Sequence, residues 1–199
     1  MLLQRGGSGI WQHRRSSGED GDAFIEFRNR EGAKKTPRTK RKKPLWLAVV
    51  GSKKSGKTSL IEALIPYLKA KGYRVATVKH SSHRHTFDRD GSDSHRHAQA
   101  GAERVVLRSP GANLFIAYDM PEDEAGRQAD EFLSNFDVVI CEGFRDANYP
   151  KVVVEGGDAK EYRGGVIARV RLTATDREKP VMPSKALRQI EAYIAAEIS

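Results

Sequence analysis

The sequence predicts an α/β fold in which helices cover both faces of a mostly parallel sheet. Strand-type apolar runs occupy residues 45–50, 74–79 and 137–141. A stretch with helical periodicity, residues 57–71, joins the first run to the second, and further helical residues precede the third. Because parallel neighbours need a crossover connection, which is usually a helix, this alternation favours a parallel sheet.

The first predicted helix follows a glycine-rich turn and ends near Gly72. Its apolar residues recur at intervals of three and four, as on one helix face: Leu60, Ile61, Leu64, Ile65 and Leu68. Gly72 is a typical stop signal after Lys69 and Lys71. Pro66 removes a backbone hydrogen bond inside the helix, at a cost of about 3 kcal/mol, so we expect a kink there.

The later elements are shorter or more polar. Two strands are predicted around Val105 and Phe115, with a Pro110-Gly111 turn between them. A polar helical stretch, residues 122–135, precedes the strand that ends at residue 141. The C-terminal segment is predicted to be a helix with an apolar face made of Leu187, Ile190, Ile194 and Ile198.

Charge divides the chain into a basic leader, residues 1–44, and a folded domain, residues 45–199. The leader holds 12 Lys and Arg against five Asp and Glu, which gives +7 of the net charge of +9. Residues 34–43 are the most basic part, yet no aromatic side chains alternate with the charges. A disordered, solvated leader is therefore the better interpretation than a nucleic-acid-binding segment. Within it, AFIEF at residues 23–27 could add an edge strand.

Cysteine usage and hydropathy indicate a cytoplasmic protein. The chain has one cysteine, Cys141, which excludes an internal disulfide and lies in a run typical of a buried strand. No run approaches the roughly 18 apolar residues of a membrane helix, and the N-terminus lacks the apolar region of a signal peptide. Acidic residues in the leader argue against an organelle transit peptide.

The sequence GSKKSGKT at residues 51–58 fits the G-x-x-x-x-G-K-[ST] pattern of a phosphate-binding loop (P-loop), and it lies between a strand and a helix as that motif requires. The backbone N–H groups of residues 52–57 would form an anion-binding nest, to which the helix N-terminus adds about half a positive charge. We expect Lys57 to contact the β and γ phosphates and the Thr58 hydroxyl to bind Mg²⁺. The motif thus predicts a nucleoside triphosphate site and a P-loop NTPase fold.

Such a site needs an acidic group at the end of a neighbouring strand. Glu142 comes directly after the 137–141 strand, at its carboxyl end, and Gly143 lets the chain turn away. Asp137 begins the same strand, about five residues of ~3.3 Å from the phosphate edge. Glu142 is therefore the predicted partner of the metal ion.

Residues 78–97 hold five of the six histidines together with three aspartates. A structural zinc site needs four ligands, which typically include thiols, and this segment contains no cysteine. Its arginines, Arg84, Arg89 and Arg96, would repel a dication. Contact with Mg²⁺ through Asp88, Asp90 or Asp93 is the better interpretation. The segment follows the second strand and so emerges at the same sheet edge as the P-loop.

Five blocks of residues follow one another along residues 45–154. They are Gly51–Thr58, Lys79-His80-x-x-His83, Asp88-x-Asp90-Gly91-x-Asp93-Ser94-x-Arg96, Ala100-Gly101-Ala102, and Glu142-Gly143-Phe144 with Pro150-Lys151. In this order and spacing the blocks resemble the MobB family, the GTP-binding adaptor of molybdopterin-guanine dinucleotide biosynthesis.

The resemblance implies an accessory protein with weak GTPase activity, often a homodimer, that binds GTP and Mg²⁺. It would assist the molybdenum cofactor guanylyltransferase, which joins GMP to molybdopterin. By position, Lys57 and Glu142 would be catalytic, and Thr58, Glu142 and Asp93 would hold the metal. Nucleotide and molybdopterin would contact Gly51, Ser52, Lys53, Lys54, Ser55, Gly56, Lys57, Thr58, Ser59, His80, His83, Asp90 and Asp93.

One family-independent signal is missing: the chain has no N-K-x-D guanine-reading motif. Thr175-Asp176 could supply a carboxylate to guanine, but so short a pair is a weak signal. Guanine preference therefore rests on the resemblance. Two other P-loop functions stay open. A nickel-delivery GTPase would be expected to add thiols or a histidine-rich tail, and a small-molecule kinase would close arginines such as Arg84, Arg89 and Arg96 over the phosphates.

Overall fold

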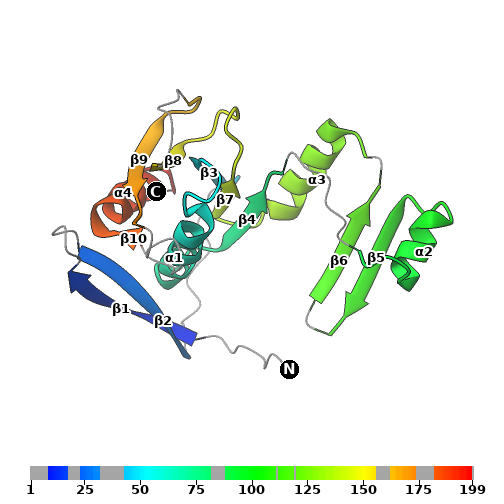
Figure 1. Ribbon diagram of the computed structural model, residues 1–199, viewed down its shortest axis with the longest axis horizontal. Helices are drawn as coiled ribbons and strands as arrows, with labels where there is room; N and C mark the ends of the chain where they lie inside the picture. Colours follow the sequence, from blue (N-terminus) through cyan, green and yellow to red (C-terminus); the bar gives the residue numbers. More distant parts are fainter. Residues whose placement is uncertain are drawn as a thin grey trace. The chain divides into compact units, whose positions relative to one another are not determined.

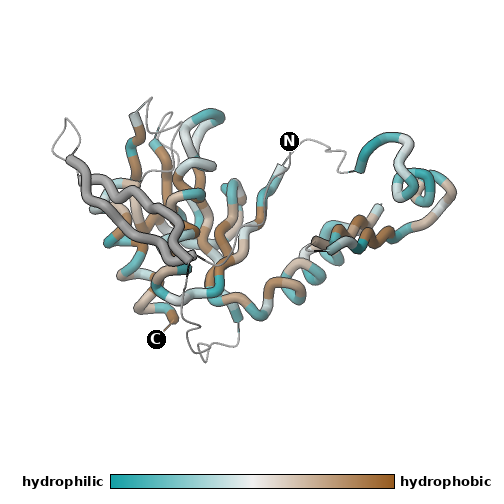
Figure 2. Tube along the Cα trace, turned by 90° about the horizontal axis from the view of Figure 1, so that it is seen from below, coloured by the Kyte–Doolittle hydropathy of each residue, from teal (hydrophilic) through white to brown (hydrophobic). Residues whose placement is uncertain are grey.

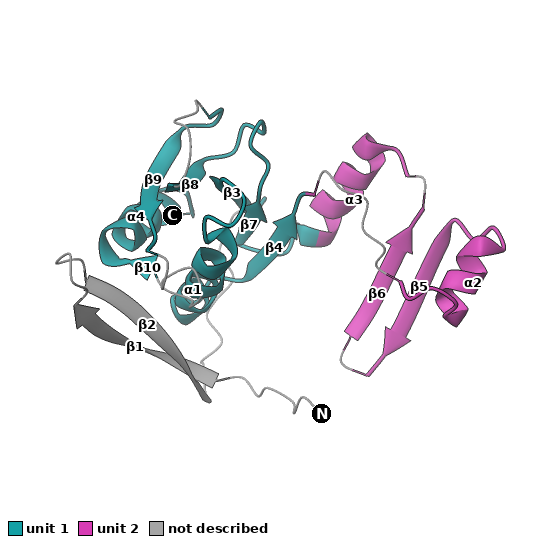
Figure 3. Cartoon of the chain, in the orientation of Figure 1, with its two compact units in different colours: residues 1–80, 133–199 teal, residues 81–132 magenta. Residues whose placement is uncertain are grey.

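The computed structural model describes residues 9–17, 23–31, 43–81, 88–110, 112–118, 120–155, 162–173 and 182–198 (Figure 1). The chain divides into two compact units, which are described separately here (Figure 3). The first comprises residues 1–80 and 133–199, and the second comprises residues 81–132. Among the described residues, no helix is both long and apolar enough to cross a membrane.

The first unit is built on a five-stranded sheet in the order β4-β7-β3-β8-β9, with every neighbouring pair parallel. Its carboxyl ends therefore share one edge, where ligands of such folds bind. The predicted parallel sheet is confirmed. Its strands are β3 (Leu45–Gly51), β4 (Val75–Lys79), β7 (Val138–Glu142), β8 (Lys151–Glu155) and β9 (Val166–Arg171).

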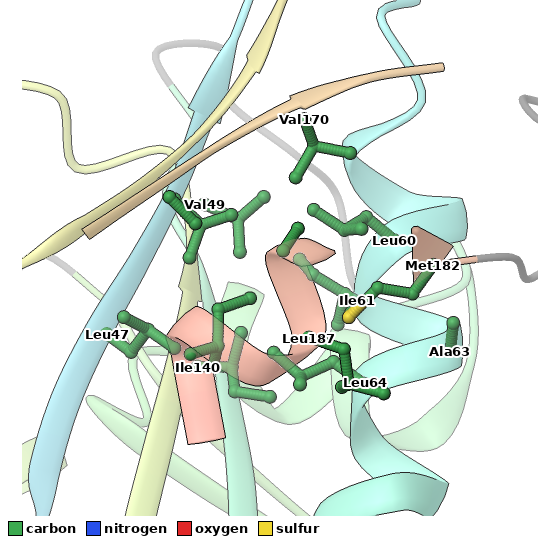
Figure 4. Packing of buried hydrophobic residues seen from close by; sticks show 14 of the residues in the cluster. Leu47, Val49, Leu60, Ile61, Ala63, Leu64, Ile140, Val170, Met182 and Leu187 are labelled. Carbon is green, nitrogen blue, oxygen red and sulfur yellow. The ribbon is translucent and has the colours of Figure 1, made fainter. Parts of the chain in front are cut away.

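Successive residues of the central strand β3 belong to two different hydrophobic clusters, because side chains alternate across a sheet. Leu47 and Val49 pack in the larger cluster with α1 (Lys57–Ala70) and α4 (Ser184–Ile198), as Figure 4 shows at close range. The intervening Ala48 and Val50 pack in the second cluster, which includes Leu133 and several aromatic side chains. Both faces of β3 are buried, which explains its near-continuous apolar sequence.

Left-handed glycines flank the helix α1: Gly56 (φ 96°) is its N-cap, and Gly72 (φ 93°) follows its C-cap Lys71. The predicted stop at Gly72 is confirmed, and the helical assignment runs through Pro66 without interruption. The C-terminal helix α4 is also confirmed, and its Leu187, Ile190 and Ile194 are buried.

The second unit holds α2 (Asp93–Gln99), β5 (Arg104–Ser109), β6 (Ala112–Ala117) and most of α3 (Glu122–Leu133). The two strands predicted around Val105 and Phe115 are present, but they form an antiparallel two-stranded sheet of their own. The short connection at residues 110–111 explains why the two strands pair antiparallel, because only antiparallel strands can be joined by so few residues. Figure 2 shows apolar stretches along this hairpin as well as along the central sheet.

Two further strands lie inside residues 1–44. β1 (Gly9–Ser17) and β2 (Ala23–Glu31) form an antiparallel hairpin, and β2 also pairs with the short β10 (Met182–Pro183). β2 contains the AFIEF segment that the sequence indicated as a possible edge strand. The proposed division at residues 44 and 45 stays a prediction.

Cys141 lies in β7 with no exposed surface, which confirms the buried strand thiol. Burial raises the pKa of this thiol to about 12, so at pH 8 roughly one molecule in ten thousand carries the reactive thiolate. We expect native protein to react with an aromatic disulfide reagent at least ~100-fold more slowly than protein in guanidinium chloride. Equal rates would show that β7 opens freely.

Candidate functional site

The P-loop connects β3 to α1 in the way the motif predicted. Gly51 is required because a Cβ there would lie 2.5 Å from the carbonyl oxygen of Val154 on the neighbouring strand β8. Lys54 (φ 62°) and Gly56 (φ 96°) take left-handed backbone conformations, which curl the loop into a nest. The Ser55 hydroxyl oxygen is buried in this loop without a hydrogen-bond partner in the structure. A buried polar atom of this kind needs a partner, which a ligand or a water molecule could supply.

Lys57 folds back over the loop. Its Nζ donates to the Ser52 carbonyl at 2.7 Å and to the Gly51 carbonyl at 3.3 Å. Burial lowers its pKa, the Glu142 carboxylate opposes this, and the positive charges of Arg145 and Lys79 lower the pKa further. The ammonium group therefore lies among other cations, in surroundings that an anionic ligand would stabilise.

Thr58 and Glu142 meet at the mouth of the loop. The Thr58 hydroxyl donates to Glu142 Oε2 at 3.3 Å, and Lys79 Nζ lies 3.5 Å from Glu142 Oε1. This follows from the strand order, because β7 lies between β3 and β4 and its carboxyl end is next to theirs. Asp137, at the other end of β7, accepts instead from the backbone N–H of Arg74 at 2.6 Å. The structure thus brings Glu142, and not Asp137, to the P-loop.

The remaining predicted residues fall into three groups. His80 follows β4, donates its backbone N–H to the Glu142 carbonyl at 3.0 Å and packs its ring against Phe144. His83 lies outside the described residues. Asp90 and Asp93 belong to the second unit. There, Asp90 Oδ1 lies 3.8 Å from His95 Nε2, and Asp93 Oδ1 lies 3.9 Å from Arg96 Nη1. Among the described residues, no three His, Cys, Asp or Glu side chains gather as a metal site.

Within the loop itself, Ser59 is buried at the start of α1, whereas Lys53 and Lys54 are exposed. Ser52 supplies a carbonyl to Lys57. The nucleotide and metal roles of all these residues stay predictions.

Sequence reasoning missed Arg145, whose Nη2 donates to the Gly51 carbonyl at 3.2 Å. The available signal was its position three residues after Glu142, at the carboxyl edge of the sheet. Lys151 appeared in the sequence only as part of the Pro150-Lys151 block, and its burial was not predicted, because its partners are backbone carbonyls.

The comparison with protein families matches residues 46–169 to the family described as "MobB: Molybdopterin guanine dinucleotide synthesis protein B". The chain belongs to the MobB family. The matched region spans β3 through most of β9 and therefore includes the P-loop, Thr58, Glu142 and Arg145.

Curated MobB relatives support the same assignment. The molybdopterin-guanine dinucleotide biosynthesis adapter protein of Haemophilus influenzae is 37% identical over 112 residues, which cover 54% of this chain and 61% of the relative. The adapter protein of Escherichia coli is 32% identical over 106 residues, which cover 50% of this chain and 59% of the relative. The matched region thus spans about three fifths of these relatives' own length.

Solved MobB structures have the same fold. A crystal structure of Bacillus subtilis MobB aligns with 67% of this chain and 82% of its own, at 25% identity and a TM-score of 0.52. A second crystal structure, of molybdopterin-guanine biosynthesis protein B, aligns with 76% of this chain and 99% of its own, at 27% identity and a TM-score of 0.50.

Proposed function

We propose that this MobB-family protein is a GTP-binding adaptor with slow, Mg²⁺-dependent GTPase activity in molybdenum cofactor biosynthesis. Its role would be to assist the guanylyltransferase that attaches GMP to molybdopterin. The observation that carries the proposal is the meeting of the P-loop, Thr58 and Glu142 at one edge of a parallel sheet, in a chain of this family. We expect the protein to act in the cytoplasm.

The charge and the backbone shape of the P-loop suit the phosphates of a nucleoside triphosphate. The left-handed residues at positions 54 and 56 turn the backbone into a nest, and α1 directs its N-terminus toward the same place. Lys57 would exchange the Gly51 and Ser52 carbonyls for phosphate oxygens. The buried Ser55 hydroxyl would gain its missing partner there.

The donor set at Thr58 and Glu142 suits Mg²⁺. The two side-chain oxygens lie 3.3 Å apart. Neighbouring oxygens of an octahedral site with bonds of ~2.1 Å lie roughly 3 Å apart, so the two side chains could serve one ion directly or through water. Bound Mg²⁺ would neutralise charge on the phosphates. Asp93 as a third ligand, and His80, His83 and Asp90 as contacts of nucleotide or molybdopterin, are proposals carried by the family pattern alone.

A ligand titration tests the function as a whole. Melting temperature is followed while GTP, ATP and molybdopterin are added separately with Mg²⁺. At 100 times the dissociation constant a ligand stabilises the native state by about 2.7 kcal/mol, which corresponds to roughly 5–10 °C for a chain of this size. Selective stabilisation by GTP and molybdopterin is expected. Stabilisation by ATP alone would favour a kinase.

We expect Glu142→Gln to retain bound GTP and to slow its hydrolysis by about 10-fold or more. The amide keeps an oxygen near Thr58 but removes the negative charge that orders the metal and its water. A single-turnover assay with radiolabelled GTP measures both quantities, with and without the guanylyltransferase. Wild-type turnover should be far below the ~1–100 s⁻¹ of kinases and should rise with the partner. Kinase-like turnover by the protein alone would contradict an adaptor role.

The β5–β6 hairpin supports the proposal of a homodimer. Val106, Leu107, Leu114 and Phe115 are all exposed on it, and Phe115 keeps 64% of its surface exposed. Val106 lies opposite Phe115 on one face of the hairpin, and Leu107 lies opposite Leu114 on the other face. Exposed apolar side chains that cluster in this way mark interaction surfaces. A two-fold interface would bury each residue twice.

We therefore expect Phe115→Asp to weaken the dimer by about 100-fold or more, since two phenyl groups each lose roughly 1.5–3 kcal/mol of burial. Analytical ultracentrifugation over a concentration series measures the change. Ala112→Asp, which introduces the same charge on the same strand but on the opposite face from Phe115, should leave the dimer nearly unchanged. A monomeric wild type would exclude this arrangement.

A further inference from the structure

The loop between β7 and β8, residues 143–150, is fixed at its start by backbone geometry. Gly143 (φ 95°) and Phe144 (φ 54°) are successive left-handed residues directly after Glu142. The Gly143 N–H donates to the Val49 carbonyl of β3 at 3.0 Å. A phenylalanine in this conformation is strained and persists only where the surroundings impose it. The loop therefore leaves the sheet in a defined direction, across β3, the strand that precedes the P-loop.

The other end of the loop is fixed by a buried charge. Lys151 has no exposed surface, and its Nζ donates to the carbonyls of Ala147 at 2.6 Å and Tyr149 at 2.7 Å. Burial lowers its pKa, while Cys141 and Asp146 oppose that shift. The Tyr149 ring also stacks on Trp46 with centroids 5.3 Å apart. A buried ammonium group needs these carbonyls, because leaving it unpaired would cost several kcal/mol.

Arg145 lies between these two fixed ends, and its side chain reaches the P-loop. Its Nη2 lies 3.2 Å from the Gly51 carbonyl oxygen, which also accepts from Lys57 Nζ at 3.3 Å. Two full positive charges thus share one neutral acceptor. The carboxylate described beside them, Glu142, is already in contact with Lys79 and Thr58. Lys57, Lys79 and Arg145 thus lie around the mouth of the P-loop, where Glu142 offsets only part of their positive charge.

We propose that Arg145 contacts the terminal phosphate of the bound nucleotide, and that Lys151 is a positioning residue that holds the Arg145 loop in place. This inference rests on the proposed nucleotide-binding function. On binding, Arg145 exchanges the Gly51 carbonyl for an oxygen of the γ-phosphate, with which it makes a charge-assisted hydrogen bond. Because Arg145 is exposed and the loop ends are fixed, this exchange requires only side-chain movement.

The same contact would assist hydrolysis. A water oxygen forms the new bond to the γ-phosphorus, the bond from that phosphorus to the β–γ bridging oxygen breaks, and GDP leaves with the electron pair. The proton lost by the water passes to the released phosphate. Arg145 would stabilise the charge on the γ-phosphate oxygens, as arginines supplied in cis or in trans do in other P-loop proteins. Arg89 and Arg96, two of the sequence candidates for this task, lie in the other unit, and Arg96 faces Asp93.

The test compares GTP with GDP. Dissociation constants of both nucleotides, and single-turnover hydrolysis rates, are measured for wild type, Arg145→Ala and Arg145→Lys. Arg145→Ala should raise the dissociation constant of GTP by about 10-fold to 100-fold and that of GDP by less than about 3-fold, because only GTP carries a γ-phosphate. Arg145→Lys should restore part of the difference. Arg163→Ala, an exposed arginine in the loop before β9, is the matched control and should change neither constant.

The outcomes separate this inference from the function on which it rests. Equal weakening of GTP and GDP, or no change in either, would overturn the role of Arg145 while leaving the nucleotide site intact. Failure of the wild type to bind either nucleotide would overturn both.

The role of Lys151 is tested by a double-mutant cycle. Lys151→Met should reproduce the selective loss of GTP, and adding Arg145→Ala should bring little further loss, because the arginine is then no longer held in place. Full additivity of the two losses would overturn the positioning role. Circular dichroism is recorded first. Should Lys151→Met fail to fold, Lys151→Gln, which keeps a hydrogen-bond donor, takes its place in the cycle.

Discussion

Replacing Lys57 with Ala is expected to weaken GTP binding by about 100-fold or more while leaving the fold intact. In the proposed complex the ammonium group would make charge-assisted hydrogen bonds to the phosphates, each contributing roughly 1.5–3 kcal/mol. In this structure its Nζ donates to the loop carbonyls of Gly51 and Ser52, and Lys57 belongs to neither of the two hydrophobic core clusters. Equilibrium dialysis with labelled GTP measures binding, and far-UV circular dichroism measures the fold.

The matched control for this variant is Lys69→Ala. Lys69 lies in the last turn of the same helix, α1, and is exposed. Its removal should leave the affinity for GTP unchanged and cost only a few tenths of a kcal/mol through the helix dipole. Wild-type affinity in the Lys57 variant would mean that residues 51–58 are not a working phosphate site.

The second large effect is expected at Gly51. A Cβ at this position would meet the Val154 carbonyl oxygen at 2.5 Å and the Ser55 hydroxyl oxygen at 2.8 Å. The nearer atom belongs to the backbone of β8, so the strands β3 and β8 must separate or the loop must shift. Gly51→Ala should therefore lower stability by about 1–3 kcal/mol, or roughly 3–10 °C in melting temperature, and should also weaken GTP binding.

Replacing a glycine that has open space around it should change stability in the opposite direction. Gly126 lies in α3, and a Cβ there would meet no heavy atom within 4 Å. Gly126→Ala should stabilise the helix by about 0.5–1 kcal/mol, because alanine loses less backbone entropy on folding. Differential scanning calorimetry of the two variants compares them directly. A stable Gly51→Ala protein that binds GTP normally would show that β3 and β8 are not held at this distance.

The core of the candidate nucleotide site could be predicted from the sequence because it is local. Residues 51–58 form the P-loop through their own glycines and the helix that follows, and Glu142 is placed by being the last residue of an apolar strand. The helical period of α1 and the apolar face of α4 likewise follow from nearby residues. The histidine-rich segment shows where this reasoning ends: its residue types suggest chemistry, but its contacts depend on distant parts of the chain.

By itself, the sequence determined the parallel α/β class, the position of the phosphate-binding loop and the choice of Glu142 over Asp137, since periodicity and motif spacing encode these directly. Only the tertiary structure decided that β5 and β6 form a sheet of their own, that Val154 presses on Gly51, and that Arg145 reaches the P-loop on a segment held by Lys151. These features depend on which strands become neighbours and where backbone carbonyls then face. Residues that are about 100 positions apart meet through that pairing, and no local pattern records it.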